Sequence, residues 1–197
     1  MKNILQKEEK VLHQVTDPVP LENIPSPKIK KILKEMSASL KKQDDGVAIA
    51  APQIGYPLRI FVISGKIFSK DFMLNKEGGI KEPPRPSDTP PSQGEKKIKP
   101  ASPTIKDLVF INPKISKLSR EKDWVPEGCL SVRWLYGKTY RSKKATVEAY
   151  DETGKKYKMG GSGLLAQIFQ HETDHLNGIL FTDHAREIKE ELPPKEL

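Results

Sequence analysis

The chain has 197 residues, of which 36% are hydrophobic, so it is long enough for one domain with a sizeable core and short for two. It has no apolar run of the roughly 20 residues that span a bilayer and no signal-peptide core at its start, so we expect a cytoplasmic protein without membrane association. The net charge of +8 comes from scattered lysines interleaved with glutamates, which argues against specific DNA binding but allows transient association with a polyanion such as the ribosome.

The first predicted element is an amphipathic helix over residues 27–43. Ser26 and Pro27 are an N-cap followed by a proline at the first helical position. Apolar residues then recur at helical spacing, namely Ile29, Ile32, Leu33, Met36 and Leu40. The turn signal DDG at 44–46 ends the helix.

Two short apolar strands are predicted next, Leu58–Ile63 and Leu108–Ile115, and the composition changes between them. Residues 76–105 hold seven of the 17 prolines of the chain, together with several lysines. Such a segment cannot bury enough apolar surface to offset the entropy that is lost on ordering. We therefore predict a flexible Pro/Lys-rich insertion at about 76–105, within a single domain that covers residues 1–197.

The second half of the chain alternates as a strand over Ala145–Asp151, turns at 152–154 and returns as a strand over Lys155–Met159. A second helix is predicted to follow, with Ser162 as its N-cap and Gly178 as its terminator. Its apolar residues are Leu164, Leu165, Ile168, Phe169 and Leu176.

This second helix carries the segment QHETDHLNG, residues 170–178. Its two histidines, His171 and His175, are one helical turn apart, so both imidazoles point the same way. Glu172 lies beside them, where it can reach a metal-bound water without binding the metal. This HExxH arrangement is typical of a site in which two His bind a metal and Glu is the general base. The alternative is a chance spacing of core or surface histidines, which is disfavoured in a chain with only four His.

A metal tripod needs a third ligand, and the sequence offers few. Phe181 stands where an extended HExxHxxGxxH motif would place a third histidine. Asp174 and Asp183 are acidic candidates, although Asp174 points around the helix from the histidine pair. Cys129 is the single cysteine and sits in the turn EGCLS at 127–131, where a thiolate would be a natural metal donor. A lone cysteine is otherwise a small buried hydrophobe, and it cannot form an intramolecular disulfide.

Three segments together resemble the signature segments of the peptide deformylase family. They are GVAIAAPQIG at 46–55, EGCLS at 127–131 and QHETDHLNG at 170–178, in the order of the family. The similarity extends through GLLAQIFQHE and ILFTD and covers nearly the whole chain apart from the insertion. It implies an α+β fold in which mixed and antiparallel strands surround a central HExxH helix, with the helix at 27–43 packed outside.

The resemblance also implies the roles of the site residues. The implied metal ligands are Cys129, His171 and His175. A fourth, open position for water marks a catalytic rather than a structural site. Glu172 would take a proton from this water and pass it to the leaving amine. The side chain of Gln53 and the backbone N–H of Leu130 would stabilise the oxyanion. Without the flanking motif, Gln53 is better explained as a loop-stabilising amide.

The implied substrate is the N-formyl-methionyl end of a nascent peptide, from which formate is released. Four apolar positions match the methionine pocket of the family and are equally well explained as ordinary core: Val47, Val125, Leu164 and Ile168. The segment around Val47, including Gly46, is expected to pair with the peptide backbone as an added strand. Arg141 is implied to pair with Glu127 and so to orient the cysteine turn, which includes Gly128.

The implied cofactor is one divalent metal ion in a Cys/His/His site, which suits Fe²⁺, Zn²⁺, Ni²⁺ or Co²⁺. The family implies Fe²⁺ in vivo, with the other three as substitutes. We further expect the protein to be a monomer.

Three residues depart from the pattern of the family. Ala48 replaces a glycine of the first segment, Arg133 replaces a proline after EGCLS and is followed by Trp134, and His184 stands where arginine is common. None of them is a ligand or the base, so they bear on substrate preference. They leave two alternatives open: a related amidase with another N-acyl substrate, and a noncatalytic peptide-binding relative, which the intact catalytic positions disfavour.

Overall fold

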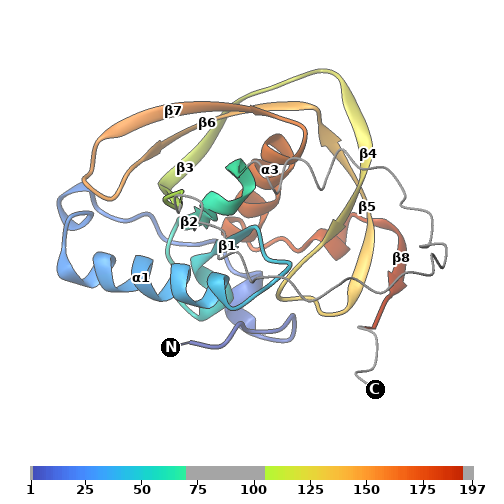
Figure 1. Cartoon of the computed structure of the whole chain (residues 1–197), viewed down its shortest axis with the longest axis horizontal. Helices are drawn as coiled ribbons and strands as arrows, with labels where there is room; N and C mark the ends of the chain where they lie inside the picture. Colours follow the sequence, from blue (N-terminus) through green and yellow to red (C-terminus); the bar gives the residue numbers. More distant parts are fainter. Residues whose placement is uncertain (1, 70–104, 193–197) are drawn as a thin grey trace, which may run out of the picture.

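The computed structural model describes residues 2–69 and 105–192 (Figure 1). The predicted insertion at 76–105 therefore lies outside the described residues, apart from its last residue. The described helices are α1 (Pro27–Lys41) and α3 (Leu164–Leu176), and short 3-10 helices are η1 (Lys10–His13), η2 (Leu21–Asn23), η3 (Ala51–Ile54), η4 (Gly65–Phe68) and η5 (Phe181–Asp183). Neither α1 nor α3 combines the length and the apolarity that crossing a bilayer requires.

The described strands form two sheets. They are β1 (Ala48–Ala50), β2 (Ile60–Ile63), β3 (Leu108–Leu118), β4 (Lys122–Gly128), β5 (Leu135–Ser142), β6 (Lys144–Tyr150), β7 (Lys156–Ser162) and β8 (Arg186–Glu190). One sheet has the order β1-β2-β3-β6-β7 and the other the order β4-β5-β8. All neighbouring strands in both sheets are antiparallel. The predicted α+β class is therefore confirmed, with antiparallel rather than mixed sheets.

The helix α1 covers one face of the five-stranded sheet. The hydroxyl of Ser26 accepts a hydrogen bond from the backbone N–H of Ile29, as an N-cap does, and the helix ends two residues before the predicted boundary. Its buried side chains face the core and pack with residues of β1, β2 and β3, among them Ile49, Val62 and Ile111. Its lysines remain exposed, so α1 lies on the outside of the fold.

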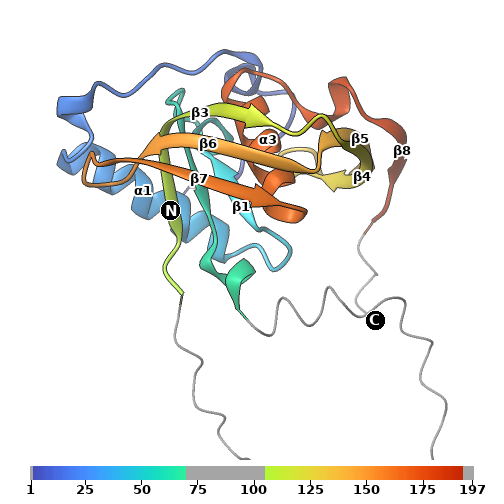
Figure 2. The same ribbon diagram turned by 90° about the horizontal axis from the view of Figure 1, so that it is seen from above.

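The helix α3 packs on the opposite face of the same sheet. Successive residues of a strand point to opposite faces, so one strand contributes side chains to the core under each helix. In β2, Val62 faces the core on the α1 side, whereas Phe61 faces the core on the α3 side. There the ring of Phe110 stacks on Phe61 at 4.5 Å and meets Phe169 of α3 edge-on at 5.5 Å, measured between ring centroids. Figures 1 and 2 show α3 in the middle of the fold, enclosed by strands of both sheets.

The predicted N-cap of the second helix is wrong. Ser162 is the last residue of β7, and the N-cap is Gly163, which has φ 55° and ψ −129° and no side-chain cap. This backbone conformation is open to glycine and costly for residues with a Cβ, so one residue suffices to turn the strand into the helix. Gly178, with φ 73°, follows the end of α3 as predicted.

Candidate metal centre

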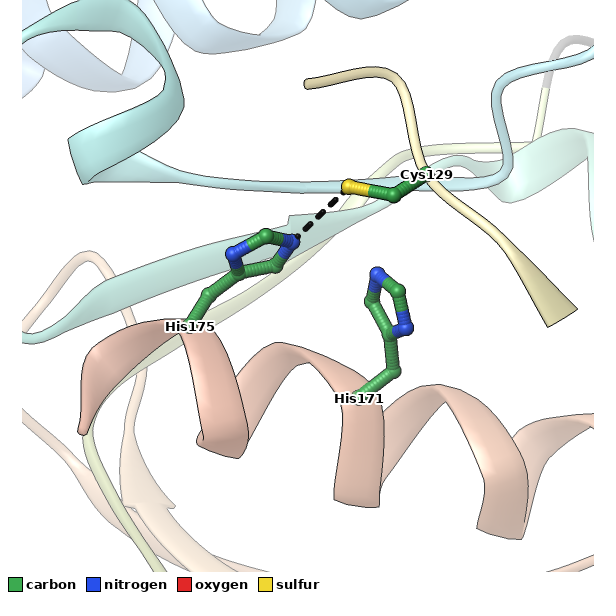
Figure 3. Close-up of side chains that lie close together, drawn as sticks. All are labelled: Cys129, His171 and His175. Carbon is green, nitrogen blue, oxygen red and sulfur yellow. Dashed lines mark hydrogen bonds between the residues drawn. The ribbon is translucent and has the colours of Figure 1, made fainter. Parts of the chain in front are cut away.

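The helix α3 presents two imidazoles to one side. His171 and His175 are four residues apart, their ring centroids are 4.8 Å apart and their planes meet at 79°. Figure 3 shows both rings projecting from the helix toward Cys129. His175 is 1% exposed, because it lies on the side of α3 that faces the core. The helical spacing therefore brings both imidazoles to one point, as the sequence predicts.

The third donor comes from the turn that follows β4. The Sγ atom of Cys129 lies 3.1 Å from Nε2 of His175, and one donor atom from each of Cys129, His171 and His175 lies within 4.8 Å of the others (Figure 3). The backbone N–H of Ser131 donates to Sγ at 3.4 Å, and the Nε2 of Gln53 donates at 3.5 Å. Donors directed at the sulfur suit a thiolate. The donor set fits a borderline-soft divalent ion such as Fe²⁺ or Zn²⁺.

A buried acid orients the first histidine. Oε1 of Glu127 lies 2.5 Å from Nδ1 of His171 and accepts at 2.7 Å from Nη2 of Arg141. Its Oε2 accepts from Nε of Arg141 at 3.1 Å and from the hydroxyl of Thr139 at 2.5 Å. The hydrogen bond between Nδ1 and Glu127 directs Nε2 of His171 to the cysteine side, where release of its proton on metal binding would free a lone pair; a carboxylate at the other ring nitrogen is the usual outer-shell arrangement of metal-binding histidines. The pairing of Arg141 with Glu127 is present as predicted, but the direct contact between Glu127 and His171 was not foreseen.

The electrostatics of the ligands follow from burial and from this network. Burial favours the protonated form of Glu127, but hydrogen bonds to His171 and Arg141 outweigh it and hold the pKa of the Glu127 carboxyl well below its usual range. Burial opposes the charged form of His171, yet its hydrogen bonds to Cys129 and Glu127 raise its pKa well above the ordinary value. Burial lowers the pKa of His175 well below the ordinary value, so this imidazole is neutral and can donate a lone pair.

Glu172 has the surroundings of an acid–base group. Its side chain is 3% exposed, it lines the cleft beside His171, and its Oε2 has no hydrogen-bond partner in the described part of the chain. Burial raises the pKa of Glu172 to about 7, while the nearby His171 opposes this shift. A carboxyl group that titrates near neutral pH at the floor of a cleft is a candidate for proton transfer.

The two predicted oxyanion donors both belong to residues next to Cys129. Gln53 belongs to η3, where its Oε1 accepts from the N–H of Ala50 at 2.8 Å and its Nε2 donates to the hydroxyl of Ser131 at 3.1 Å. Leu130 is 8% exposed, lines the cleft and directly follows Cys129. Both predicted donors therefore lie beside the proposed metal ligands, and the loop-stabilising role of Gln53 is also present.

A cleft of about 410 Å³ opens above these groups. Three of the four predicted pocket residues line it, namely Val47, Leu164 and Ile168. Val125 does not: it lies on β4, opposite Thr139, and the cleft is lined by its neighbour Pro126 instead. The cleft also contains residues that were not predicted: Asp45, Tyr136 and Gln167. Tyr136 comes from β5, a strand that the sequence pattern did not reveal.

One wall of the cleft is the free edge of β1, which is the outermost strand of its sheet. The N–H of Ser64 donates to the carbonyl of Val47 at 2.9 Å, so the polar groups of Val47 point toward β2. Those of Ala48 point the other way, because alternate residues of a strand bond to opposite sides. Gly46, which precedes β1, already donates its N–H to the carbonyl of Gln43 at 3.2 Å. Gly46 and Ala48 both line the cleft, where Ala48 can offer its backbone N–H and carbonyl, and Gly46 its carbonyl, to an extended peptide.

We predict that Arg141→Met destabilises the metal-free protein, because the Glu127 carboxylate would be left buried without its cation. Breaking a buried ion pair on one side typically costs about 3–5 kcal/mol of unfolding free energy. Urea unfolding would measure the loss. Lys143→Met is the control: its partners Glu121 and Asp123 are exposed, so its unfolding free energy should stay nearly unchanged. Equal losses in both variants would contradict a special role of the buried network.

Comparison with known proteins points to one family. The family model described as polypeptide deformylase matches residues 1–191. The chain is 36% identical to peptide deformylase 2 of Clostridium acetobutylicum over 183 residues, which is 93% of this chain and 94% of that protein. It is 34% identical to the peptide deformylase of Rhizobium meliloti over 182 residues, covering 92% of this chain and 83% of the relative.

Solved structures agree with the sequence relatives. The crystal structure of a peptide deformylase from Legionella pneumophila superposes with a TM-score of 0.71 and 28% identity, covering 95% of this chain and 87% of that chain. A Met-Ala-Ser bound class I type b peptide deformylase from Acinetobacter baumannii superposes with a TM-score of 0.69 and 27% identity, covering 93% and 99%. Sequence and fold therefore lead to the same group of enzymes.

Proposed function

The chain belongs to the peptide deformylase family, whose members remove the N-terminal formyl group from formylated nascent peptides, and we propose that Cys129, His171 and His175 hold the metal ion on which this activity depends. The observation that carries the proposal is the convergence of the three donor atoms within 4.8 Å at the floor of a cleft, with Glu172 beside them. When bound, a divalent ion would lower the pKa of a coordinated water and polarise the formyl carbonyl.

In this proposal Glu172 moves the proton. It takes a proton from the attacking water and later gives it to the amine nitrogen of methionine, while the C–N bond of the formamide breaks and formate leaves. A pKa of about 7 suits a group that must be base and acid within one cycle. Because the carboxyl is buried, bulk water does not compete for its proton. Glu172 is therefore proposed as a proton carrier and not as a ligand.

The oxyanion of the tetrahedral intermediate needs donors that are already in place. We assign this role to the side-chain N–H of Gln53, which contacts Cys129, and the backbone N–H of Leu130, which follows Cys129 in the chain. Contacts to Ala50 and Ser131 hold the Gln53 amide in one orientation. Such preorganisation costs no rearrangement when the negative charge develops on the formyl oxygen.

The peptide is proposed to lie along the free edge of β1. The formyl end must sit near Cys129, and Gln53, which contacts Cys129, lies just beyond the C-terminal end of β1. A peptide that continues from this point therefore runs antiparallel to β1, toward Gly46 and Asp45. Its methionine side chain enters the apolar pocket of Val47, Leu164 and Ile168. The Acinetobacter baumannii deformylase, solved with Met-Ala-Ser bound, supports a site that holds several residues.

We propose Fe²⁺ as the metal in vivo, with Zn²⁺, Ni²⁺ or Co²⁺ able to occupy the same donors, and we place the protein in the cytoplasm as a monomer that associates transiently with ribosomes. The test is release of formate from formyl-Met-Ala by anaerobically purified protein, with metal analysis of the same sample. Acetyl-Met-Ala is the control. Turnover of the acetyl but not the formyl peptide would assign a different N-acyl substrate, and turnover of neither would overturn the proposal.

We expect the segment predicted as an insertion to be dispensable for chemistry. Replacing residues 78–103 with a short Gly/Ser linker should leave metal content and formyl-Met-Ala turnover within about twofold of the parent, because loops of different length close at similar entropic cost. The described site residues all lie outside this segment. A loss of solubility or of metal would contradict this expectation and make the segment structural.

A further inference from the structure

An ion pair joins the two walls of the cleft at its outer end. Nη1 of Arg133 lies 2.5 Å from Oδ2 of Asp45, and its Nη2 donates to Oδ1 of Asp45 at 3.1 Å and to Oε1 of Gln43 at 3.0 Å. Asp45 and Arg133 both line the cleft. Asp45 directly precedes Gly46, which lies two residues before the start of β1, and Arg133 lies on the loop that follows the cysteine turn. The pair therefore spans the path of a peptide that leaves the metal centre.

The position of the pair along the peptide follows from strand geometry and rests on the proposed function. The methionine whose side chain fills the pocket lies opposite Ala48, and the residue two positions further lies opposite Gly46, because only alternate residues bond across one edge. The N–H of Gly46 is bound to the carbonyl of Gln43, so its carbonyl is the group that can accept from this third residue. The third residue of the peptide then lies beside Asp45. Two residues of strand cover about 7 Å, so a dipeptide ends before it reaches the pair.

The two partners differ in what they present to the peptide. The side chain of Arg133 is 20% exposed, and its guanidinium is bound by Asp45 and Gln43 and lies 4.8 Å from the ring centre of Trp134. The side chain of Asp45 is 53% exposed, and the exposed Asp44 precedes it. The solvent-facing half of the pair is thus the carboxylate, while the cation is held behind it.

We propose that the Asp45–Arg133 pair is a specificity-determining element that reads the charge of the third residue of the formyl peptide, favouring lysine or arginine over glutamate or aspartate. An incoming cation meets the exposed carboxylate of Asp45, whereas an acidic side chain meets the same carboxylate and is repelled. Exposed charge pairs contribute about 0.2–1 kcal/mol, which corresponds to a preference of at most about fivefold in kcat/KM. The difference should reside in KM, since the third residue does not touch the bond that breaks.

The test compares three amidated substrates, formyl-Met-Ala, formyl-Met-Ala-Lys and formyl-Met-Ala-Glu, at low ionic strength. The parent should prefer the Lys over the Glu peptide by about two- to fivefold. Asp45→Asn should reverse this order, because Arg133 then faces the peptide without its anion. Arg133→Gln should keep or increase the preference for Lys, and the double variant should show none. Glu22→Gln, an exposed acid of η2 that does not line the cleft, is the matched charge control and should behave as the parent.

Each outcome has one reading. Opposite shifts of the Lys-to-Glu ratio in the two single variants support the proposal, and high salt should weaken the ratio in the parent. The same Lys-to-Glu ratio of kcat/KM in all variants, with or without a uniform loss of turnover of all three peptides, would overturn it and show that the pair has only a structural role. Absence of turnover on every formyl peptide by the parent would instead mean that the proposed function fails.

Discussion

Glu172→Gln is expected to lower formyl-Met-Ala turnover by about 10²–10⁴-fold, the range that positioned acid–base catalysis contributes. Gln keeps the size of the side chain and much of its hydrogen bonding but cannot accept the proton of the attacking water. Metal content should stay near stoichiometric, because Glu172 is not among the three converging donors. The affinity for a product peptide such as Met-Ala should change little, since the apolar pocket and the edge of β1 remain intact.

Three measurements on the Glu172→Gln variant separate its possible roles: metal analysis, a binding isotherm for the product peptide and a formate-release assay. Loss of metal together with turnover would make Glu172 a structural or ligating residue. Turnover close to that of the parent would assign the base to another group. Only the loss of turnover with metal and peptide binding preserved agrees with the proposed proton transfer.

Cys129→Ser is expected to reduce metal affinity by more than the roughly 10–100-fold that follows loss of an outer-shell contact. A neutral hydroxyl is a poor replacement for a thiolate, and the two remaining histidines do not complete a tripod. Formyl-peptide turnover should fall with metal occupancy. Metal titration of the apoprotein, followed by turnover at saturating metal, would measure both effects.

A second cysteine variant makes this result sharper. Cys129→Asp retains an anionic donor at the same position, so it should hold more metal than Cys129→Ser even if turnover stays low. Urea unfolding of both variants controls for loss of the fold. Full metal content and normal turnover in Cys129→Ser would show that the ligand set is wrong.

The two histidines of the proposed metal centre could be predicted from the sequence because their signal is local, whereas Cys129 was assigned through the resemblance to the family. The spacing of His171 and His175 needs only a helix, and the apolar periodicity of 164–176 indicates one. The four predicted strands were found within three residues of their observed ends, because β2 and β3 are apolar and β6 alternates cleanly. Local pattern is therefore sufficient where an element buries apolar side chains.

The sheet that carries the cysteine could not be predicted in this way. On β4 and β5 the residues that face the interior include Glu127, Thr139 and Arg141, all buried and polar. Their polar groups are satisfied by one another and by His171, so burial occurs without the apolar alternation that marks a strand. The network that orients His171 therefore replaces the hydrophobic pattern from which β4 and β5 could have been predicted. Tyr136, the cleft residue on β5, was missed for this reason.

The start of α3 was also beyond sequence reasoning. Ser162 has the chemistry of an N-cap, but the cap position is taken by Gly163, whose backbone conformation only tertiary context reveals. Likewise, Arg133 could be recognised as a departure from the pattern of the family, whereas its partner Asp45 is 88 residues away in the sequence. Such long-range pairs require the fold.

The first residues of the chain take part in the site as well. The N–H of Leu5 donates to the carbonyl of Gln53 at 2.8 Å, and the side chain of Gln6 donates to the carbonyl of Leu130 at 3.1 Å and accepts from the N–H of Arg133 at 3.3 Å. One short segment thus holds both proposed oxyanion donors and one partner of the ion pair.

The contacts of Gln6 join residues 124 and 127 positions apart, so they are among the high-contact-order interactions of the fold. Contacts of this kind form only after long loops have closed, which places completion of the cleft late in folding. They also determine the local stability of the site. If the first few residues detach, Gln53 and the cysteine turn lose these hydrogen bonds while both sheets stay folded. The rate of amide hydrogen exchange at Leu5 would report how often this segment detaches, and the fraction of molecules competent for catalysis should fall as detachment becomes more frequent.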